Sequence, residues 1–298
     1  MLNRRILRIK AFKTLYAYAE NPSMSLKEAG NLLEESCQAV RDLYLFMLAL
    51  ISPLTAEAEA RINAAKNKFN PTEEEKNPNL KFVQNGIAPI LNRDPDFQKI
   101  ISRKKLSWEQ YDVFLRKLYE SVRSKQYFKD YMENPGRSLR QDAKLFVSIF
   151  EEEFVDNADL EAILEELSIL WNDDLAYALT YCCRAVESIA EGKPWSLPDL
   201  YDGERDFVFD LVRNAYCSFD TYNHMIAEAV PGWDKDRLFI IDVVLIITGV
   251  AESANFKDIP DKVTINEYVE ISKYYSTPKS RSFVNGLLDK LIKEIRTN

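Results

Sequence analysis

Apolar residues recur three and four positions apart along most of this 298-residue chain, and strict alternation of apolar and polar residues is sustained nowhere. The first spacing is typical of amphipathic helices, and the second of half-buried strands. The sequence therefore predicts an all-α fold. A helix is expected from the Ser25–Glu28 capping box to about Phe69, with a kink or stop at Pro53. The other predicted helices cover 4–20, 107–133, 138–154, 159–170, 172–190, 205–229, 234–253, 261–275 and 278–295.

The segment EGKPWSLPDLYDGE (191–204) separates two groups of predicted helices. Two prolines and two glycines interrupt the helical pattern there, and both residue types commonly end helices. We expect three regions: a basic first helix with a second helical segment (1–69), an inserted helical region (70–200), and a C-terminal helical bundle (201–298).

Charge is distributed unevenly along the chain, whose net charge is -8. This balance argues against binding of a polyanion over the entire surface. However, residues 1–13 contain only basic charged side chains, whereas residues 151–174 contain only acidic ones. The sequence thus predicts one basic face on an otherwise acidic protein.

The chain lacks the residue sets of common catalytic sites. His224 is the single histidine, no Gly-x-Ser-x-Gly motif accompanies it, and neither a Walker loop nor a dinucleotide fingerprint occurs. The acids of 151–174 could be imagined as a metal site, but their distribution around helices favours a solvated surface. We expect no enzymatic activity, no metal and no cofactor.

The cysteines and the apolar runs indicate the cellular compartment in which the protein is expected. Cys37, Cys182, Cys183 and Cys217 form no Cys-x-x-Cys pair, and no signal peptide is evident. We interpret them as reduced, buried thiols. The apolar run LYLFMLALI (43–51) is too short to span a bilayer. We therefore expect a cytoplasmic protein without a membrane anchor.

Three arginines open the predicted first helix. Arg4 and Arg8 are four residues apart and share a face, with Arg5 beside them and Tyr16 further along. Guanidinium groups bind phosphates and stack on bases, and an aromatic ring adds stacking surface. A solvated helix face is the commoner explanation of an isolated arginine cluster, so this helix alone leaves both interpretations open.

The last quarter of the chain contains two motifs in a fixed order. IPDKVTINE is followed by SRSFVNGLLDKL, and WDKDRLFIIDVVLIITGVAE (233–252) precedes both. This arrangement resembles the NusB family of transcription antitermination factors, and RRILRIKAFKTLYAY at the N-terminus is similar to the first helix of that family. The resemblance covers about 3–20 and 202–298. It implies NusB-like helical bundles with additional inserted helices.

The resemblance also implies a function. Members of the family bind single-stranded boxA-type RNA together with the ribosomal small-subunit protein NusE, within the RNA polymerase antitermination complex that supports ribosomal RNA transcription. Matching motif positions suggests a partner-protein contact at Asp242. It suggests RNA contacts at Arg4, Arg5, Arg8, Tyr16, Tyr275, Lys279, Arg281 and Phe283. Among these, we expect Arg5 and Arg8 to be solvated.

Two rival functions fit the same resemblance. One is the NusB-like RNA-binding domain of certain ribosomal RNA cytosine methyltransferases, which would require a Rossmann-type catalytic domain beyond Asn298. The other is a helical protein-interaction scaffold that has lost RNA binding.

Asn285-Gly286 lies inside the last predicted helix, although Asn-Gly is ordinarily a turn signal. We expect Gly286 to admit a closely crossing helix, because it has no Cβ. We also expect Asn285 to bond a neighbouring backbone or Asn266, with direct RNA contact as the alternative. Pro278 is expected in the first turn of the helix, after Thr277 as its cap.

The inserted region is expected to pack away from the basic helix and to offer a docking surface for a protein. The acids of 151–174 would repel RNA. The alternative is that this acidic stretch covers the basic helix and competes with RNA.

Overall fold

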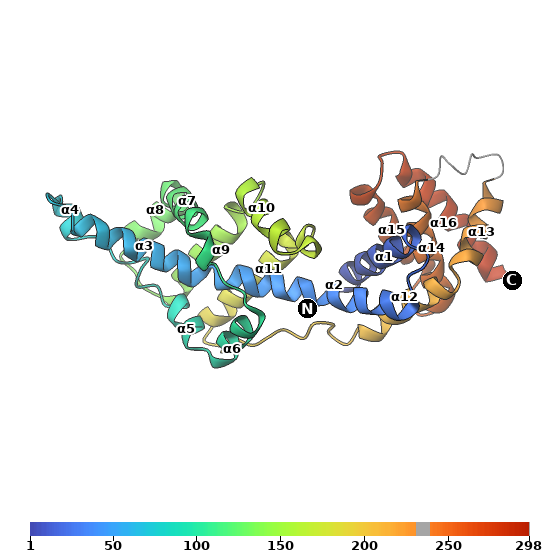
Figure 1. Ribbon diagram of the computed structural model, residues 1–298, viewed down its shortest axis with the longest axis horizontal. Helices are drawn as coiled ribbons and strands as arrows, with labels where there is room; N and C mark the ends of the chain where they lie inside the picture. Colours follow the sequence, from blue (N-terminus) through green and yellow to red (C-terminus); the bar gives the residue numbers. More distant parts are fainter. Residues whose placement is uncertain (231–238, 298) are drawn as a thin grey trace. The chain divides into compact units, whose positions relative to one another are not determined.

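The computed structural model describes residues 1–230 and 239–297, and within these ranges it contains helices and no strand (Figure 1). The all-α prediction is confirmed. Trp233 and the start of the predicted helix 234–253 lie outside the described residues. The α-helices are α1 (Arg4–Glu20), α2 (Leu26–Ala49), α3 (Ile51–Lys66), α4 (Glu73–Lys76), α5 (Ile87–Arg93), α6 (Pro95–Lys104), α7 (Asp112–Ser124), α8 (Gln126–Glu133), α9 (Leu139–Glu152), α10 (Ala158–Leu167), α11 (Leu175–Ala190), α12 (Arg205–Cys217), α13 (Phe219–Ala229), α14 (Ile240–Asn255), α15 (Asp261–Tyr275) and α16 (Ser280–Thr297).

Helix boundaries follow the local capping signals closely. The Ser25 amide donates to the Glu28 carboxylate at 2.7 Å, and the Glu28 amide donates back to the Ser25 hydroxyl at 3.3 Å, which is the predicted capping box before α2. The break between α2 and α3 precedes Pro53, which lies in the first turn of α3, where a missing N–H is tolerated. The last helix begins at Ser280, two residues later than Pro278, which lies in the preceding turn.

The stretch Leu26–Lys66 is long and apolar enough to cross a membrane by length and composition. However, 67% of its most apolar window is buried inside the protein. Burial of this extent is typical of a core helix in a globular protein.

The described residues form two compact units. The first comprises 1–38 and 199–298, and the second comprises 39–198. The three-region division predicted from the sequence stays a proposal: its boundary after residue 200 lies close to a boundary between the units, whereas its boundary after residue 69 lies inside the second unit.

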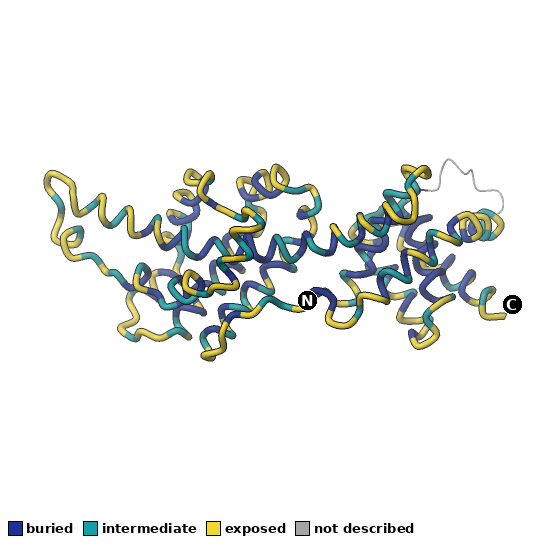
Figure 2. The backbone as a smooth tube through the Cα atoms, turned by 60° about the horizontal axis from the view of Figure 1, so that its bottom comes forward, coloured by how far each residue is buried: buried dark blue, intermediate teal, exposed yellow. Residues whose placement is uncertain are grey.

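Helix α14 is the centre of the first unit, where it packs against α1, α12, α13, α15 and α16. All of its residues from Asp242 to Ser253 are buried. Figure 2 shows the buried residues gathered where the helices of each unit face one another, with exposed residues on the outer turns. A helix that is buried on every side needs apolar residues all round, and the run IIDVVLIITGVA supplies them.

The glycine that permits a close helix crossing is Gly249 on α14, and the expectation for Gly286 is wrong. A Cβ on Gly249 would lie 2.7 Å from the Leu288 side chain of α16 and 3.0 Å from the Tyr268 ring of α15, whereas a Cβ on Gly286 would meet nothing within 4 Å. Asn285 is exposed beside Gly286, and no hydrogen bond joins it to Asn266 in the described structure. The Asn-Gly pair therefore lies on the solvent face of α16.

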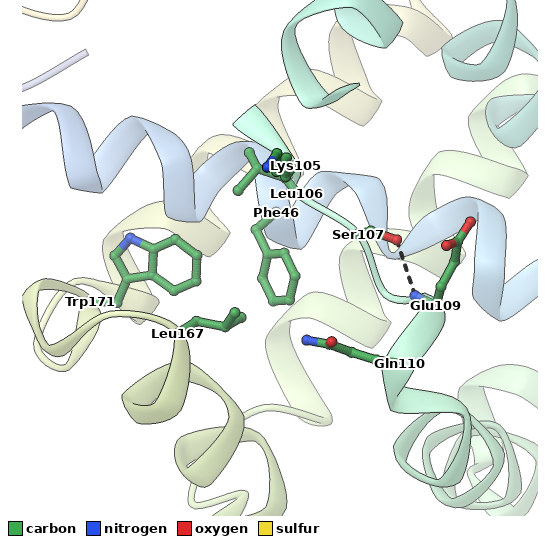
Figure 3. Close-up of a pocket in the computed structure, with 8 residues that line it drawn as sticks. All are labelled: Phe46, Lys105, Leu106, Ser107, Glu109, Gln110, Leu167 and Trp171. Atoms are coloured by element: carbon green, nitrogen blue, oxygen red, sulfur yellow. Dashed lines mark hydrogen bonds between the residues drawn. The ribbon is translucent and has the colours of Figure 1, made fainter. Parts of the chain in front are cut away.

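The second unit has its own core. Phe46 stacks on Trp108 with ring centroids 4.2 Å apart, and the Trp108 indole donates a hydrogen bond to the Phe46 carbonyl at 2.8 Å. A pocket of about 200 Å³ opens beside this pair, and the side chains of Phe46, Leu167 and Trp171 line it (Figure 3). Most acids of the stretch 151–174 are exposed, as expected of a solvated surface.

The structure also tests the expectations for the four cysteines and for the single histidine. Cys37 and Cys182 are buried free thiols, as predicted, but Cys183 is only half-buried and Cys217 is exposed. His224 is exposed and lies 3.3 Å from Glu228, which agrees with its expected surface role.

Candidate nucleic-acid interface

Arg8 links α1 to α14, the central helix of the first unit. Its guanidinium donates two hydrogen bonds to the Glu252 carboxylate, at 2.7 and 2.8 Å, and only 4% of the side chain is exposed. Thr264 and Tyr268 of α15 donate to the same carboxylate, at 2.8 and 3.1 Å. The expectation that Arg8 is solvated is wrong, because a buried carboxylate 244 residues away satisfies it.

The electrostatics of this cluster are those of a fully paired buried network. Burial acts to lower the pKa of Arg8, but the hydrogen bonds and the charge of Glu252 outweigh it, and the pKa is raised. Burial, with a further contribution from Glu252, raises the pKa of Tyr268 well above its ordinary value. Arg8 is thus a permanent cation and Tyr268 a neutral donor, and the network positions α1 against α14 and α15.

Arg5 lies on the surface at the same helix junction. Its Nε and Nη2 atoms each donate to Glu267 of α15 at 2.8 Å, and 53% of the side chain is exposed. The hydrogen bonds from Arg5 lower the pKa of Glu267, although burial opposes them. The Arg5 guanidinium is therefore held in a defined orientation while it remains open to solvent.

Arg4 occupies the other side of the α1 N-terminus. It pairs with Glu204 at 2.9 Å, and its guanidinium lies over the Phe207 ring of α12, 5.1 Å from the centroid. The Arg8 guanidinium lies 5.5 Å from the same centroid. The closest carboxylate differs for each arginine: Glu204 for Arg4, Glu267 for Arg5 and Glu252 for Arg8. The three arginines therefore do not form one solvated face.

An aromatic group follows further along α1. Phe12 lies 5.5 Å from Tyr275 of α15 and 6.4 Å from Tyr16, measured between ring centroids. The Lys13 ammonium lies 5.3 Å from the centroid of the Tyr275 ring. The structure therefore brings Tyr16 and Tyr275 together through Phe12, with a cation beside them.

Helix α1 packs mainly against α12 and α14, and its side chains also reach α15. Arg5 contacts Glu267, and Lys13 contacts Tyr275. The second contact lies eight residues after the first on both helices. At a rise of 1.5 Å per residue, the two contacts lie about 12 Å apart. These contacts place Arg5 beside Glu267 and Lys13 beside Tyr275, which is at the C-terminal end of α15.

The start of α16 adds two cations to this surface. Lys279 and Arg281 are exposed, and Phe283 is half-buried. The hydrogen bond from the Lys273 ammonium lowers the pKa of Glu270, with smaller effects from the charges of Arg281 and Arg5. Of the eight sequence-predicted RNA residues, Arg8 is buried, and the other seven are at least partly exposed on α1, at the end of α15 and around the start of α16.

Asp242 does not lie on an exposed partner face. It is 3% exposed in the first turn of α14, and its carboxylate accepts a hydrogen bond from the Ser276 hydroxyl at 2.6 Å. Ser276 in turn bonds the Ser280 hydroxyl at 2.8 Å. Asp242 therefore orders the turn between α15 and α16 beside Lys279, and its expected contact with a partner protein does not fit this burial.

Two surface residues were not singled out from the sequence. Lys13 lies against Tyr275, and Tyr274 is 84% exposed at the end of α15. The sequence carried a signal for both, since a basic residue follows Phe12 and two tyrosines stand together at positions 274 and 275. The structure shows which of these two tyrosine rings is exposed, because it fixes the direction of each side chain on α15.

Comparison with known proteins places the C-terminal part of the chain. The sequence model of the NusB family matches residues 189–293. The transcription antitermination protein NusB of Chloroherpeton thalassium is 38% identical over 93 residues, which are 31% of this chain and 44% of that protein. The corresponding protein of Methylacidiphilum infernorum is 36% identical over 100 residues, which are 34% of this chain and 70% of that protein.

A third relative gives the same picture. The NusB protein of Acetivibrio thermocellus is 33% identical over 95 residues, which are 32% of this chain and 66% of that protein. This chain thus spans 44% to 70% of the length of these relatives. No solved structure gives a significant match.

Proposed function

Since the chain belongs to the NusB family, we propose that it is an RNA-binding transcription antitermination factor. It binds single-stranded boxA-type RNA together with the ribosomal protein NusE, and it supports ribosomal RNA transcription within the RNA polymerase antitermination complex. It acts in the cytoplasm by binding, without catalysis.

The single observation that carries this proposal is the set of side-chain contacts from α1 to α15. These contacts bring cations from the first residues of the chain to aromatic and charged residues from its last quarter. Cations that follow a phosphate backbone and rings that stack on unpaired bases are the two elements of single-stranded RNA recognition. We define the basic-aromatic surface by these residues: Arg4, Arg5, Lys13, Tyr16, Tyr275, Lys279, Arg281 and Phe283.

Arg8 is left out of this surface because it is buried and its guanidinium is occupied by Glu252. Its contribution is indirect, since it positions the helix that carries Arg5 and Lys13. Asp242 is likewise not part of a partner face, because it is buried and its carboxylate accepts a hydrogen bond from Ser276.

The ion pairs on the surface are compatible with RNA binding. Arg5 pairs with Glu267 in a half-exposed position, and Arg4 pairs with Glu204. Exposed ion pairs contribute only about 0–1 kcal/mol. A phosphate can therefore take over one of these guanidinium groups without a large loss of protein stability.

A pull-down from cell extract, with and without RNase, tests the proposal. The tagged chain is expected to recover NusE and RNA polymerase, and recovery of RNA polymerase is expected to fall after RNase treatment. A variant with Arg5, Tyr275 and Arg281 changed to Ala serves as the control for the basic-aromatic surface. Recovery of neither protein by the wild-type chain would contradict the proposed function.

A further inference from the structure

The ring of Tyr274 is exposed next to the basic-aromatic surface but is separate from its other aromatic residues. Tyr274 is 84% exposed, whereas the neighbouring Tyr275 is half-buried against Phe12 and Lys13. Consecutive residues of a helix point about 100° apart. The two rings therefore face different directions from the same end of α15.

A single exposed aromatic residue is common on proteins, so the surroundings of Tyr274 carry the argument. Glu267 and Glu270 lie seven and four positions before it, on the same face of α15. Arg5 bonds Glu267. Arg5 therefore lies along the stretch of α15 surface that also carries Tyr274.

This stretch has an excess of cations. Arg5 and Lys273 neutralise Glu267 and Glu270, respectively. Arg281 lies near Glu270 and makes no ion pair within residues 1–230 and 239–297. A guanidinium without an ion pair and an open ring on one surface can bind a phosphate and a base of the same strand.

We propose that Tyr274 forms a second base-stacking position for single-stranded RNA, apart from the position at Tyr275. One unpaired base stacks on the Tyr274 ring, and the adjoining phosphates contact Arg281 and Arg5. This inference rests on the proposed RNA-binding function and adds a residue that sets how many bases the surface holds.

The test uses the full chain and fluorescently labelled boxA-type RNA, without any partner protein. Tyr274→Ala is expected to weaken binding about tenfold, as loss of one base–aromatic stack does, and to leave the salt dependence of binding unchanged. Tyr274→Phe is expected to bind as the wild type does, because it keeps the ring. Phe69→Ala, which removes a ring that is 99% exposed in the second unit, is the matched control and is expected to have no effect.

A set of RNAs, each with one abasic nucleotide, identifies the stacked base. One abasic position is expected to weaken the wild-type protein but to have no additional effect on Tyr274→Ala, because the two changes remove the same contact.

Two results would overturn the inference while leaving the proposed function intact. They are wild-type affinity of Tyr274→Ala, and equal weakening by Tyr274→Phe and Tyr274→Ala, which would indicate a hydroxyl contact instead of stacking. If the wild-type chain shows no salt-dependent RNA binding either alone or with NusE, both the inference and the proposed function are wrong.

Discussion

The guanidinium of Arg8 and the carboxylate of Glu252 are joined by two hydrogen bonds of 2.7 and 2.8 Å, with side-chain exposures of 4% and 0%. One partner comes from the first helix of the chain and the other from the central helix of the first unit. Together with the buried apolar residues of α1, the pair therefore holds α1 against α14, and α1 carries Arg5 and Lys13.

Arg8→Ala is expected to destabilise the first unit by about 3–5 kcal/mol, because it leaves the Glu252 carboxylate buried without a counter-charge. Native-state hydrogen exchange of the α14 amides measures this loss within the full chain. Arg5→Ala, at the half-exposed pair with Glu267, is the control and should cost about 0–1 kcal/mol. Equal losses from the two variants would show that the buried pair has no special role.

Gly249→Ala and Gly286→Ala are expected to change stability in opposite directions. The added methyl group at position 249 would be forced against Leu288 and Tyr268, at a cost of about 1–3 kcal/mol. At position 286 it meets open space, so the better helix propensity of Ala should stabilise α16 by about 0.5–1 kcal/mol. Thermal unfolding of both variants checks the signs, and a destabilised Gly286→Ala would restore the idea of a close crossing there.

Arg5→Ala is expected to weaken RNA binding and to reduce the slope of log affinity against log salt by roughly 0.7, the share of one phosphate contact on a single strand. The matched control is Lys257→Ala, an exposed cation of the same unit that precedes the opposite end of α15. A normal slope for Arg5→Ala, or an equal change for Lys257→Ala, would exclude a specific phosphate contact at Arg5.

Replacing Glu161, Glu165 and Glu166 with Gln tests the acidic stretch. These carboxylates are exposed on α10 and make no ion pair with any described residue. We expect unchanged RNA affinity at low salt, because we propose that the stretch does not compete with RNA. A tenfold gain in affinity, equivalent to about 1.4 kcal/mol, would support the alternative that it covers the basic helix.

The sequence predicted the all-α class and most of the helices. It missed α4, α5 and α6 and the breaks that divide 107–133 and 205–229 into two helices each, and it predicted the burial of charged residues poorly. Periodicity and caps are local, so α1, α15 and the capping box at Ser25 could be recognised directly. Arg8 looked solvated because its partner lies 244 residues further along the chain. No local pattern indicates such a pairing.

The basic-aromatic surface, too, could be predicted only in part from the sequence. The motif residues Tyr275, Lys279 and Arg281 could be placed near α1 from the family resemblance, and the structure brings Tyr275 to Lys13. The glycine at which two helices approach closely is Gly249 and not Gly286. The apolar pattern of one helix does not show this, because it depends on the register between the two helices. Likewise, only the packing of α15 shows that Tyr274 is open and Tyr275 is covered.

The most direct test of the account is the affinity of the full chain for boxA RNA and for a scrambled RNA of the same composition, each with and without NusE. We predict tighter binding to boxA, a further gain when NusE is present, and loss of both when Arg5, Tyr275 and Arg281 are changed to Ala. Equal, weak binding to the two RNAs in the presence of NusE would contradict the account.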